Sequence, residues 1–180
     1  MDEGKISLRY AHALYALAEE KSIHHEIYKE MKTVSEAFFE FPILTKTLAN
    51  PMHTNVEKLN LLIAAAGEKD ITPLLKSFFQ FVIKKGREEF MIFIAMSYQK
   101  YYREMQRIVV GKITSALPLK DESISKIRHL VDKEFDATIE LSTNIEPDII
   151  GGFIFEVDNY LMDSSVKKAL QDIKKELIRA

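Results

Sequence analysis

The sequence predicts a mainly α protein in which an N-terminal six-helix bundle is followed by a small α+β C-terminal domain. Up to Arg107, apolar residues recur every three or four positions, which is the spacing of amphipathic helices. From Ile108 onward, runs with an apolar residue at every second position appear between helical stretches, and this period is typical of half-buried strands. We therefore place a domain boundary at this change of period, with one domain at residues 1–107 and the other at 108–180.

Six helical stretches account for the first domain. The fifth, residues 73–84, is apolar on more than one side, so we expect both of its faces to be buried. Short connections between the helices favour an antiparallel bundle. The apolar stripes of the first, second and last helices are Ile6, Tyr10, Ala13, Leu14 and Leu17; Ile23, Ile27, Met31, Val34, Phe38 and Phe41; and Phe90, Ile94, Tyr98, Tyr101 and Met105.

Residues typical of helix ends separate these stretches. Asn50-Pro51 ends the short third helix, because the residue before proline is pushed out of helical geometry. Thr54 and Glu57 have the spacing of a capping box at the start of the fourth helix. The other signals are Ser22 as the cap of the second helix, Pro42 at the start of the third, Gly67 at the end of the fourth, Thr72-Pro73 at the start of the fifth and Gly86 at its end.

The second domain alternates strands and helices, which we expect to pack in layers. Ile108–Leu117 is a β-rich run that stops at Pro118, and Ile139 with Leu141 marks a second strand. Phe153, Phe155 and Val157 mark a third strand, which follows a Gly151-Gly152 turn. The remaining predictions are a helix capped by Asp121 with Ile124, Ile127, Val131 and Phe135 inward, a tight turn at Asp158-Asn159 leading to Tyr160 and Leu161, and a last helix capped by Asp163 or Ser164 with Val166, Leu170, Ile173 and Leu177 on one stripe.

The composition excludes several classes of function. The formal net charge is −2, whereas non-specific nucleic-acid binding needs a strong basic excess. There is no cysteine, which excludes disulfides, zinc–thiolate sites, iron–sulfur clusters and cysteine nucleophiles. Residues 1–8 lack the apolar segment of a signal peptide, and no apolar run is long enough to span a membrane. We therefore expect a bacterial cytoplasmic chain that associates with a membrane only through its partners.

No set of residues has the spacing of a catalytic, metal or cofactor site. Gly151-Gly152 precedes a predicted strand instead of Lys-Ser/Thr and a helix, so a sharp turn explains it better than a phosphate loop. The five histidines form no His-Glu-x-x-His pattern, and Asp163-Ser164-Ser165 lacks the glycine elbow of a nucleophile. We therefore predict that the chain is not an enzyme and has no catalytic residue, metal site or cofactor.

The first domain has more apolar helix surface than a bundle of its length readily buries. Its first helix carries a second apolar stripe, formed by Leu8, Ala11, Tyr15 and Ala18, and the fifth helix is apolar on two sides. One interpretation is a groove that receives an amphipathic helix of a partner protein. The other is that both helices lie at the centre of the bundle, and the composition alone favours neither.

Five short motifs follow one another along almost the whole chain. They are Arg9-Tyr10-Ala11-His12-Ala13-Leu14; Asn50-Pro51 followed by Lys58; Gly86-Arg87; Ile145-x-Pro147-x-Ile149-Ile150-Gly151-Gly152-Phe153; and Leu161-Met162-Asp163-Ser164-Ser165-Val166 with Leu170. In this order they resemble the delta subunit family of F-type ATP synthases, which includes the mitochondrial oligomycin-sensitivity-conferring protein. Ser164 departs from this pattern, since the family usually has glycine there, and the departure concerns only the local turn.

The resemblance implies a non-catalytic connector subunit in the stator of a proton-translocating F-type ATP synthase. The bundle would hold the N-terminal helix of an alpha subunit on the catalytic head, and the C-terminal domain would bind the b subunits of the peripheral stalk. The chain would be monomeric in isolation, and peripheral to the cytoplasmic face of a bacterial cell membrane within the complex. From the resemblance and the stripe geometry together, the residues expected to contact the alpha-subunit helix are Tyr10, Ala13, Leu14, Leu17, Leu74, Phe78 and Phe81.

A function from another class is a nucleic-acid or small-ligand binding module, formed by the C-terminal domain on a helical scaffold. The negative net charge counts against nucleic acid as the ligand. The sequence also lacks a stacking motif of aromatic and basic residues strong enough to predict single-strand binding.

Overall fold

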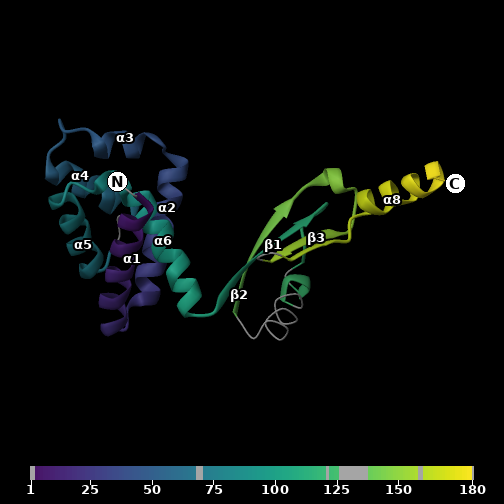
Figure 1. Cartoon of the computed structure of the whole chain (residues 1–180), viewed down its shortest axis with the longest axis horizontal. Helices are drawn as coiled ribbons and strands as arrows, with labels where there is room; N and C mark the ends of the chain where they lie inside the picture. Colours follow the sequence, from purple (N-terminus) through teal and green to yellow (C-terminus); the bar gives the residue numbers. More distant parts are fainter. Residues whose placement is uncertain (1–2, 68–70, 121, 126–137, 158–159, 180) are drawn as a thin grey trace. The chain divides into compact units, whose positions relative to one another are not determined.

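The computed structural model describes residues 3–67, 71–120, 122–125, 138–157 and 160–179. The chain divides into two compact units, Met1–Met105 and Gln106–Ala180 (Figure 1). The described part of the first unit is helical, and the sheet lies in the second. This confirms the predicted fold class, a helical bundle followed by a small α+β domain.

Six α-helices and one 3-10 turn form the described part of the first unit. The final helix of this unit, α6, packs against both α1 and α2, and α4 packs against α5 (Figure 1). The 3-10 turn, η1, contacts α3, α5 and α6. The bounds are α1 Glu3–Glu20, α2 His24–Glu40, α3 Ile43–Ala49, α4 Asn55–Ala65, α5 Pro73–Lys84, η1 Glu88–Phe90 and α6 Met91–Met105.

The two apolar stripes of α1 have different surroundings. Ala11, Tyr15 and Ala18 of the second stripe are at most 2% exposed, so this stripe faces the core of the bundle. Its fourth member, Leu8, is 45% exposed and lies outside that core. In the first stripe Leu14 is fully buried but Leu17 is 46% exposed. Ile6 of the first stripe is also buried, at 6% exposed, so this stripe lies at the edge of the core, with Ala13 and Leu17 on its exposed side.

Most of the predicted helix ends are confirmed. Thr54 and Glu57 make the capping box of α4, Thr72 caps α5 with Pro73 at its first position, and Asn50 ends α3 with an extended backbone. Gly67 and Gly86 follow α4 and α5 with φ of 104° and 61°, as glycines at helix C-termini commonly do.

The prediction that Ser22 caps α2 is wrong. Ser22 has a φ of 56°, and the cap position of α2 is Ile23, whose side chain makes no capping hydrogen bond. The Ser22 N–H donates to the carbonyl of Glu19 and the Ile23 N–H to that of Ala18, both at 2.9 Å. This pair of bonds is a Schellman motif. Ser22 therefore closes α1 instead of starting α2.

The second unit contains a four-stranded sheet with the strand order β2-β1-β3-β4 (Figure 1). β1 pairs parallel with β2 and antiparallel with β3, which pairs antiparallel with β4. The core of the sheet contains the buried side chains of Ile139 and Val157. Gly111 lies opposite Leu141 and Val157, and a Cβ there would come within 2.8 Å of the Leu141 side chain. The strands are β1 Ile108–Ser115, β2 Thr138–Ile145, β3 Phe153–Val157 and β4 Tyr160–Asp163.

The last helix, α8 (Val166–Arg179), differs from its prediction in two ways. Its cap is Ser165, whose Oγ accepts the Lys168 N–H at 3.2 Å, rather than Asp163 or Ser164. Asp163 instead accepts hydrogen bonds from Ser165, which lower the pKa of its carboxyl. The helix also does not bury its stripe in a layer on the sheet: it contacts the 3-10 turn η2 (Pro147–Ile149). Val166, Leu170, Ile173 and Leu177 are between 41% and 74% exposed.

Two predictions fall largely outside the described residues. The helix expected after Asp121 is described only at residues 122–125, which are helical, so the positions of Asp121, Ile127, Val131 and Phe135 lie outside the description. The turn expected at Asp158-Asn159 also lies outside it, although the strands on either side pair antiparallel, as a hairpin requires.

Candidate functional site

A groove lined mainly by apolar side chains lies between α1 and α5, with a volume of about 570 Å³. All seven side chains that the sequence assigns to partner binding line it. The sequence-based assignment missed two further lining residues, Arg9 and Ser77. Their positions carried a signal, because Arg9 precedes the stripe residue Ala13 by four positions and Ser77 follows Leu74 by one helical turn. The complete lining is Arg9, Tyr10, Ala13, Leu14, Leu17, Leu74, Ser77, Phe78 and Phe81.

Helical spacing explains why these residues form two facing rows. On α1, the positions three, four and seven residues after Tyr10 lie on one side of the helix. On α5, Phe78 and Phe81 follow Leu74 by four and seven residues and share a side in the same way. Each row lies within one regular helix. The packing of α1 and α5, and not the conformation of a loop, therefore determines the shape of the groove.

Aromatic contacts join the two rows. The Tyr10 ring meets the Phe78 ring edge to face, with centroids 6.4 Å apart and an interplanar angle of 70°. The same ring lies 5.9 Å from the Phe81 ring at an angle of 37°. Pairs at such separations contribute about 0.5–1.5 kcal/mol beyond their buried area. Tyr10 therefore fixes the spacing of α1 and α5 at this end of the groove.

The lining has a buried floor and an exposed rim. Leu14 is fully buried and Phe78 is 8% exposed, so both belong to the floor. Leu17 and Phe81 are 46% and 47% exposed and form the rim, together with the exposed Ala13. The expectation that both faces of α5 are buried is therefore wrong on the side of Phe81. A single chain leaves this apolar rim open to water, as a docking surface for another molecule would.

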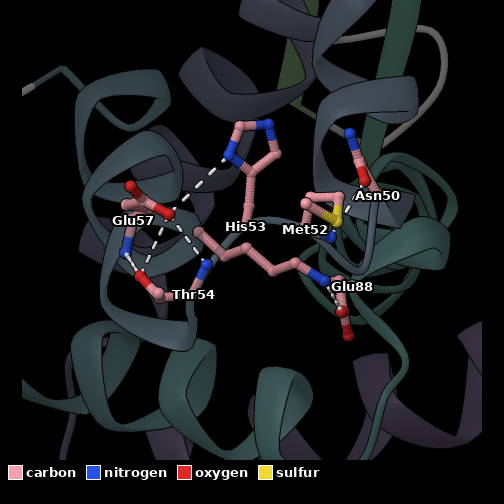
Figure 2. Close-up of polar contacts among 7 residues, drawn as sticks. Asn50, Met52, His53, Thr54, Glu57 and Glu88 are labelled. Atoms are coloured by element: carbon pink, nitrogen blue, oxygen red, sulfur yellow. Dashed lines mark hydrogen bonds and ion pairs between the residues drawn. The ribbon is translucent and has the colours of Figure 1, made fainter.

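A polar cluster at the start of α4 has a structural explanation (Figure 2). The Thr54 N–H donates to Glu57 Oε2 at 2.8 Å, and the Glu57 N–H donates to Thr54 Oγ1 at 3.2 Å. The hydrogen bond from the Thr54 backbone is the main reason why the pKa of the Glu57 carboxyl is lowered. His53 Nδ1 lies 3.7 Å from the same carboxylate. These contacts form the capping box at the first turn of α4.

The glycine pair and the histidine that could suggest a phosphate or metal site have structural roles. Gly152 has a φ of 74°, and a Cβ on it would lie 2.2 Å from the Ser164 carbonyl oxygen, so close backbone approach requires glycine there. His25 Nδ1 lies 2.8 Å from the Tyr102 hydroxyl, between helices. Within the described residues, no group of three or more His, Asp or Glu side chains is placed to hold a metal ion. None of the helices in the described ranges is both long enough and apolar enough to cross a bilayer.

Comparison with known proteins assigns the family. A sequence model of the ATP synthase delta (OSCP) subunit family matches residues 6–177. The ATP synthase subunit delta of Phocaeicola vulgatus is 39% identical over 175 residues, which are 97% of this chain and 95% of that protein. The ATP synthase subunit delta of Bacteroides thetaiotaomicron is 35% identical over 179 residues, which are 99% of this chain and 96% of that protein.

A solved structure shares the fold. It is a chain of the Toxoplasma gondii mitochondrial ATP synthase hexamer, with a TM-score of 0.65 and 17% identity over 99% of this chain and 98% of that one. The resemblance seen in the short motifs is thus confirmed by full-length sequence similarity. The chain belongs to the ATP synthase delta (OSCP) subunit family.

Proposed function

We propose that this chain is a non-catalytic connector in the stator of a proton-translocating F-type ATP synthase. Residues 1–107 bind the N-terminal helix of an alpha subunit on the catalytic head, and residues 108–180 bind the b subunits of the peripheral stalk. The observation that carries the proposal is the groove between α1 and α5, which gathers all seven predicted side chains. A connector of this kind resists torque through stable interfaces and needs no reactive group.

The dimensions and chemistry of the groove suit an amphipathic helix. Tyr10 and Leu17 are seven residues apart on α1, which corresponds to about 10 Å, or two helical turns. A partner helix lying along the groove would place side chains at i, i+3, i+4 and i+7 against the floor and rim. Ala13 is the smallest side chain in the α1 row, and it would let the partner backbone approach closely.

The second unit offers a separate surface for the stalk. Val166, Leu170, Ile173 and Leu177 of α8 follow one another at intervals of four, three and four residues, and all four are exposed. This spacing is that of a helix that packs lengthwise against another helix. Binding of the stalk there would place the chain at the cytoplasmic face of a bacterial membrane, where its attachment depends on the complex.

A pair of α1 variants with matched exposure tests the groove. Leu17→Asp places a charge on the rim, whereas Leu8→Asp places the same charge at a residue of equal exposure outside the groove, 45% against 46%. The full-length chain is titrated calorimetrically with a synthetic peptide of the alpha-subunit N-terminus. Truncation of an interface hot spot costs about 2 kcal/mol or more, so we expect Leu17→Asp to weaken binding about thirtyfold. Leu8→Asp should bind within about twofold of the parent chain.

Ala13→Leu tests the same surface without a change of charge. The larger side chain fills the groove and should weaken peptide binding, while the thermal melt stays close to that of the parent because Ala13 is exposed. Equal binding by the parent, Leu17→Asp and Ala13→Leu chains would show that the alpha-subunit peptide does not use this groove.

A further inference from the structure

We propose that the groove accepts its partner helix in one direction only, because Arg9 and Lys85 hold an acidic side chain of that helix at one end. The inference rests on the proposed function, and it adds the chemistry and the orientation of the partner. The occupant is an amphipathic helix with an Asp or Glu side chain at the end that meets these two cations.

The two cations are brought to the same end by the aromatic contacts already described. Lys85 Nζ lies over the Phe81 ring, 5.7 Å from its centroid, in a cation–π contact. Phe81 is in contact with Tyr10, and Arg9 precedes Tyr10 and also lines the groove. Lys85 follows Phe81 by four residues, so helical spacing places it on the groove side of α5. Arg9 therefore lines the α1 wall of the groove, and Lys85 stands beside the α5 wall, next to Phe81 and outside the lining itself.

The opposite end does not carry a second pair of cations. Leu17 lies about 10 Å along α1 from Tyr10, and Glu20 and Lys21 follow Leu17 by three and four residues on the same side. Both are exposed, so a carboxylate stands beside the cation at this end. A partner helix docked in the reverse direction would bring its carboxylate to this mixed pair and leave Arg9 and Lys85 without an acidic partner. The loss of attraction to two cations therefore favours a single direction.

Docking would also strengthen the attraction. Phe81 and Leu17 are half exposed in the single chain, and a helix seated on them excludes water from the rim. Charges interact more strongly as the local dielectric constant falls. The attraction of a partner carboxylate to Arg9 and Lys85 is therefore stronger beside this apolar surface than in open water.

Charge reversal on α5 provides a matched test. Lys85→Glu reverses a charge at the end of the groove, whereas Lys76→Glu makes the same change two residues after Leu74, on the other side of the helix. The full-length chains are titrated with the synthetic alpha-subunit peptide at about 0.05 M and about 0.5 M salt. We expect Lys85→Glu and Arg9→Glu each to weaken binding about five- to tenfold at low salt, and less at high salt. Lys76→Glu should stay within about twofold of the parent.

A complementary peptide identifies the partner residue. Peptides in which one acidic residue at a time is replaced by lysine are titrated against the Lys85→Glu chain. One of them should recover binding, and that peptide should bind the parent chain more weakly. If no replacement recovers binding, or if Lys76→Glu weakens it as much as Lys85→Glu does, the orienting role of Lys85 is wrong.

The same experiment separates this inference from the proposed function. Binding that depends on Leu17 but not on Arg9 or Lys85 would retain the groove as the alpha-subunit site and overturn only the charge-set direction. A parent chain that does not bind the peptide at all would overturn both.

Discussion

Lys58 Nζ donates a hydrogen bond to Glu88 Oε1 at 2.5 Å, although the two residues are 30 positions apart in the sequence. Both are buried, with exposed fractions of 6% and 9%. Glu88 Oε2 has no hydrogen-bond partner among the described residues, so Lys58 is the group that compensates the buried carboxylate. The pair connects α4 to η1, and it thereby fixes the segment between α5 and α6 against the body of the bundle.

We predict that Lys58→Met lowers the free energy of unfolding by about 3–5 kcal/mol, because it leaves the buried Glu88 carboxylate without its cation. Urea unfolding followed by circular dichroism measures the change. The exposed pair Lys100 and Glu104, 3.9 Å apart on α6, supplies the control, since Lys100→Met should cost about 1 kcal/mol or less.

The double variant Lys58→Met with Glu88→Leu distinguishes charge compensation from side-chain packing as the source of stability at this site. Both charges are then removed together, so the stability should recover most of what the single variant lost. A double variant no more stable than Lys58→Met would show that the site depends on packing of the Lys58 stem and not on charge compensation.

The capping box of α4 predicts a pH dependence. The Thr54 backbone hydrogen bond lowers the pKa of Glu57 from its ordinary value of 4.5, so the folded state favours the carboxylate. The stabilisation is complete above 4.5 and is lost as the pH falls through the lowered pKa of the folded state. Glu57→Gln retains the capping geometry but does not titrate, so its thermal midpoint should fall less steeply below pH 4.5 than that of the parent. Parallel curves for the two chains would contradict this.

Local signals predicted much of the fold. Thr54 with Glu57 and Thr72-Pro73 fix helix starts through contacts within four residues, and such contacts survive in almost any tertiary setting. The groove residues were predicted from two sources together: helical spacing decides that Tyr10 and Leu17 share a side, and the family resemblance indicated that such a side binds a partner helix.

What the sequence could not determine depends on contacts between distant segments. The two stripes of α1 are similar in composition, so only packing against α6 shows that Tyr15 faces the core and Leu17 does not. Ser22 is a suitable cap by residue type, yet closure of α1 places it at a positive φ. The pairing of Lys58 with Glu88 likewise has no local signal.

Gly152 should tolerate a side chain less well than Gly151. Gly152→Ala combines a positive φ with a Cβ 2.2 Å from the Ser164 carbonyl, so the backbone must move. Strain of this kind costs on the order of 1–3 kcal/mol. The matched control is Gly151→Ala, where φ is not positive and the nearest atom is a Val166 methyl at 3.1 Å, which can shift. Thermal unfolding of the full chain should show a clearly lower midpoint for Gly152→Ala, and equal midpoints would refute the close-approach argument.

The last prediction uses the difference in depth between two neighbouring aromatic residues of the groove. Phe78 is 8% exposed and Phe81 is 47% exposed, although both rings contact Tyr10. Phe78→Ala should lower the free energy of unfolding by about 3 kcal/mol or more, because it opens a cavity in the floor. Phe81→Ala should cost about 1 kcal/mol, because half of its ring is already in water.

For binding of the alpha-subunit peptide, Phe81→Ala is the more informative of the two variants. Phe81→Ala removes rim surface from a chain that still folds, so a loss of about tenfold or more in affinity reports the contact itself. A loss of binding by Phe78→Ala is ambiguous unless its melt is also near normal, since a collapsed floor removes the groove. If Phe81→Ala destabilises the chain as much as Phe78→Ala does, the Phe81 ring stabilises the bundle, and its exposed face is not a binding surface. Unchanged affinity with a normal melt would place the alpha-subunit helix away from the α5 rim.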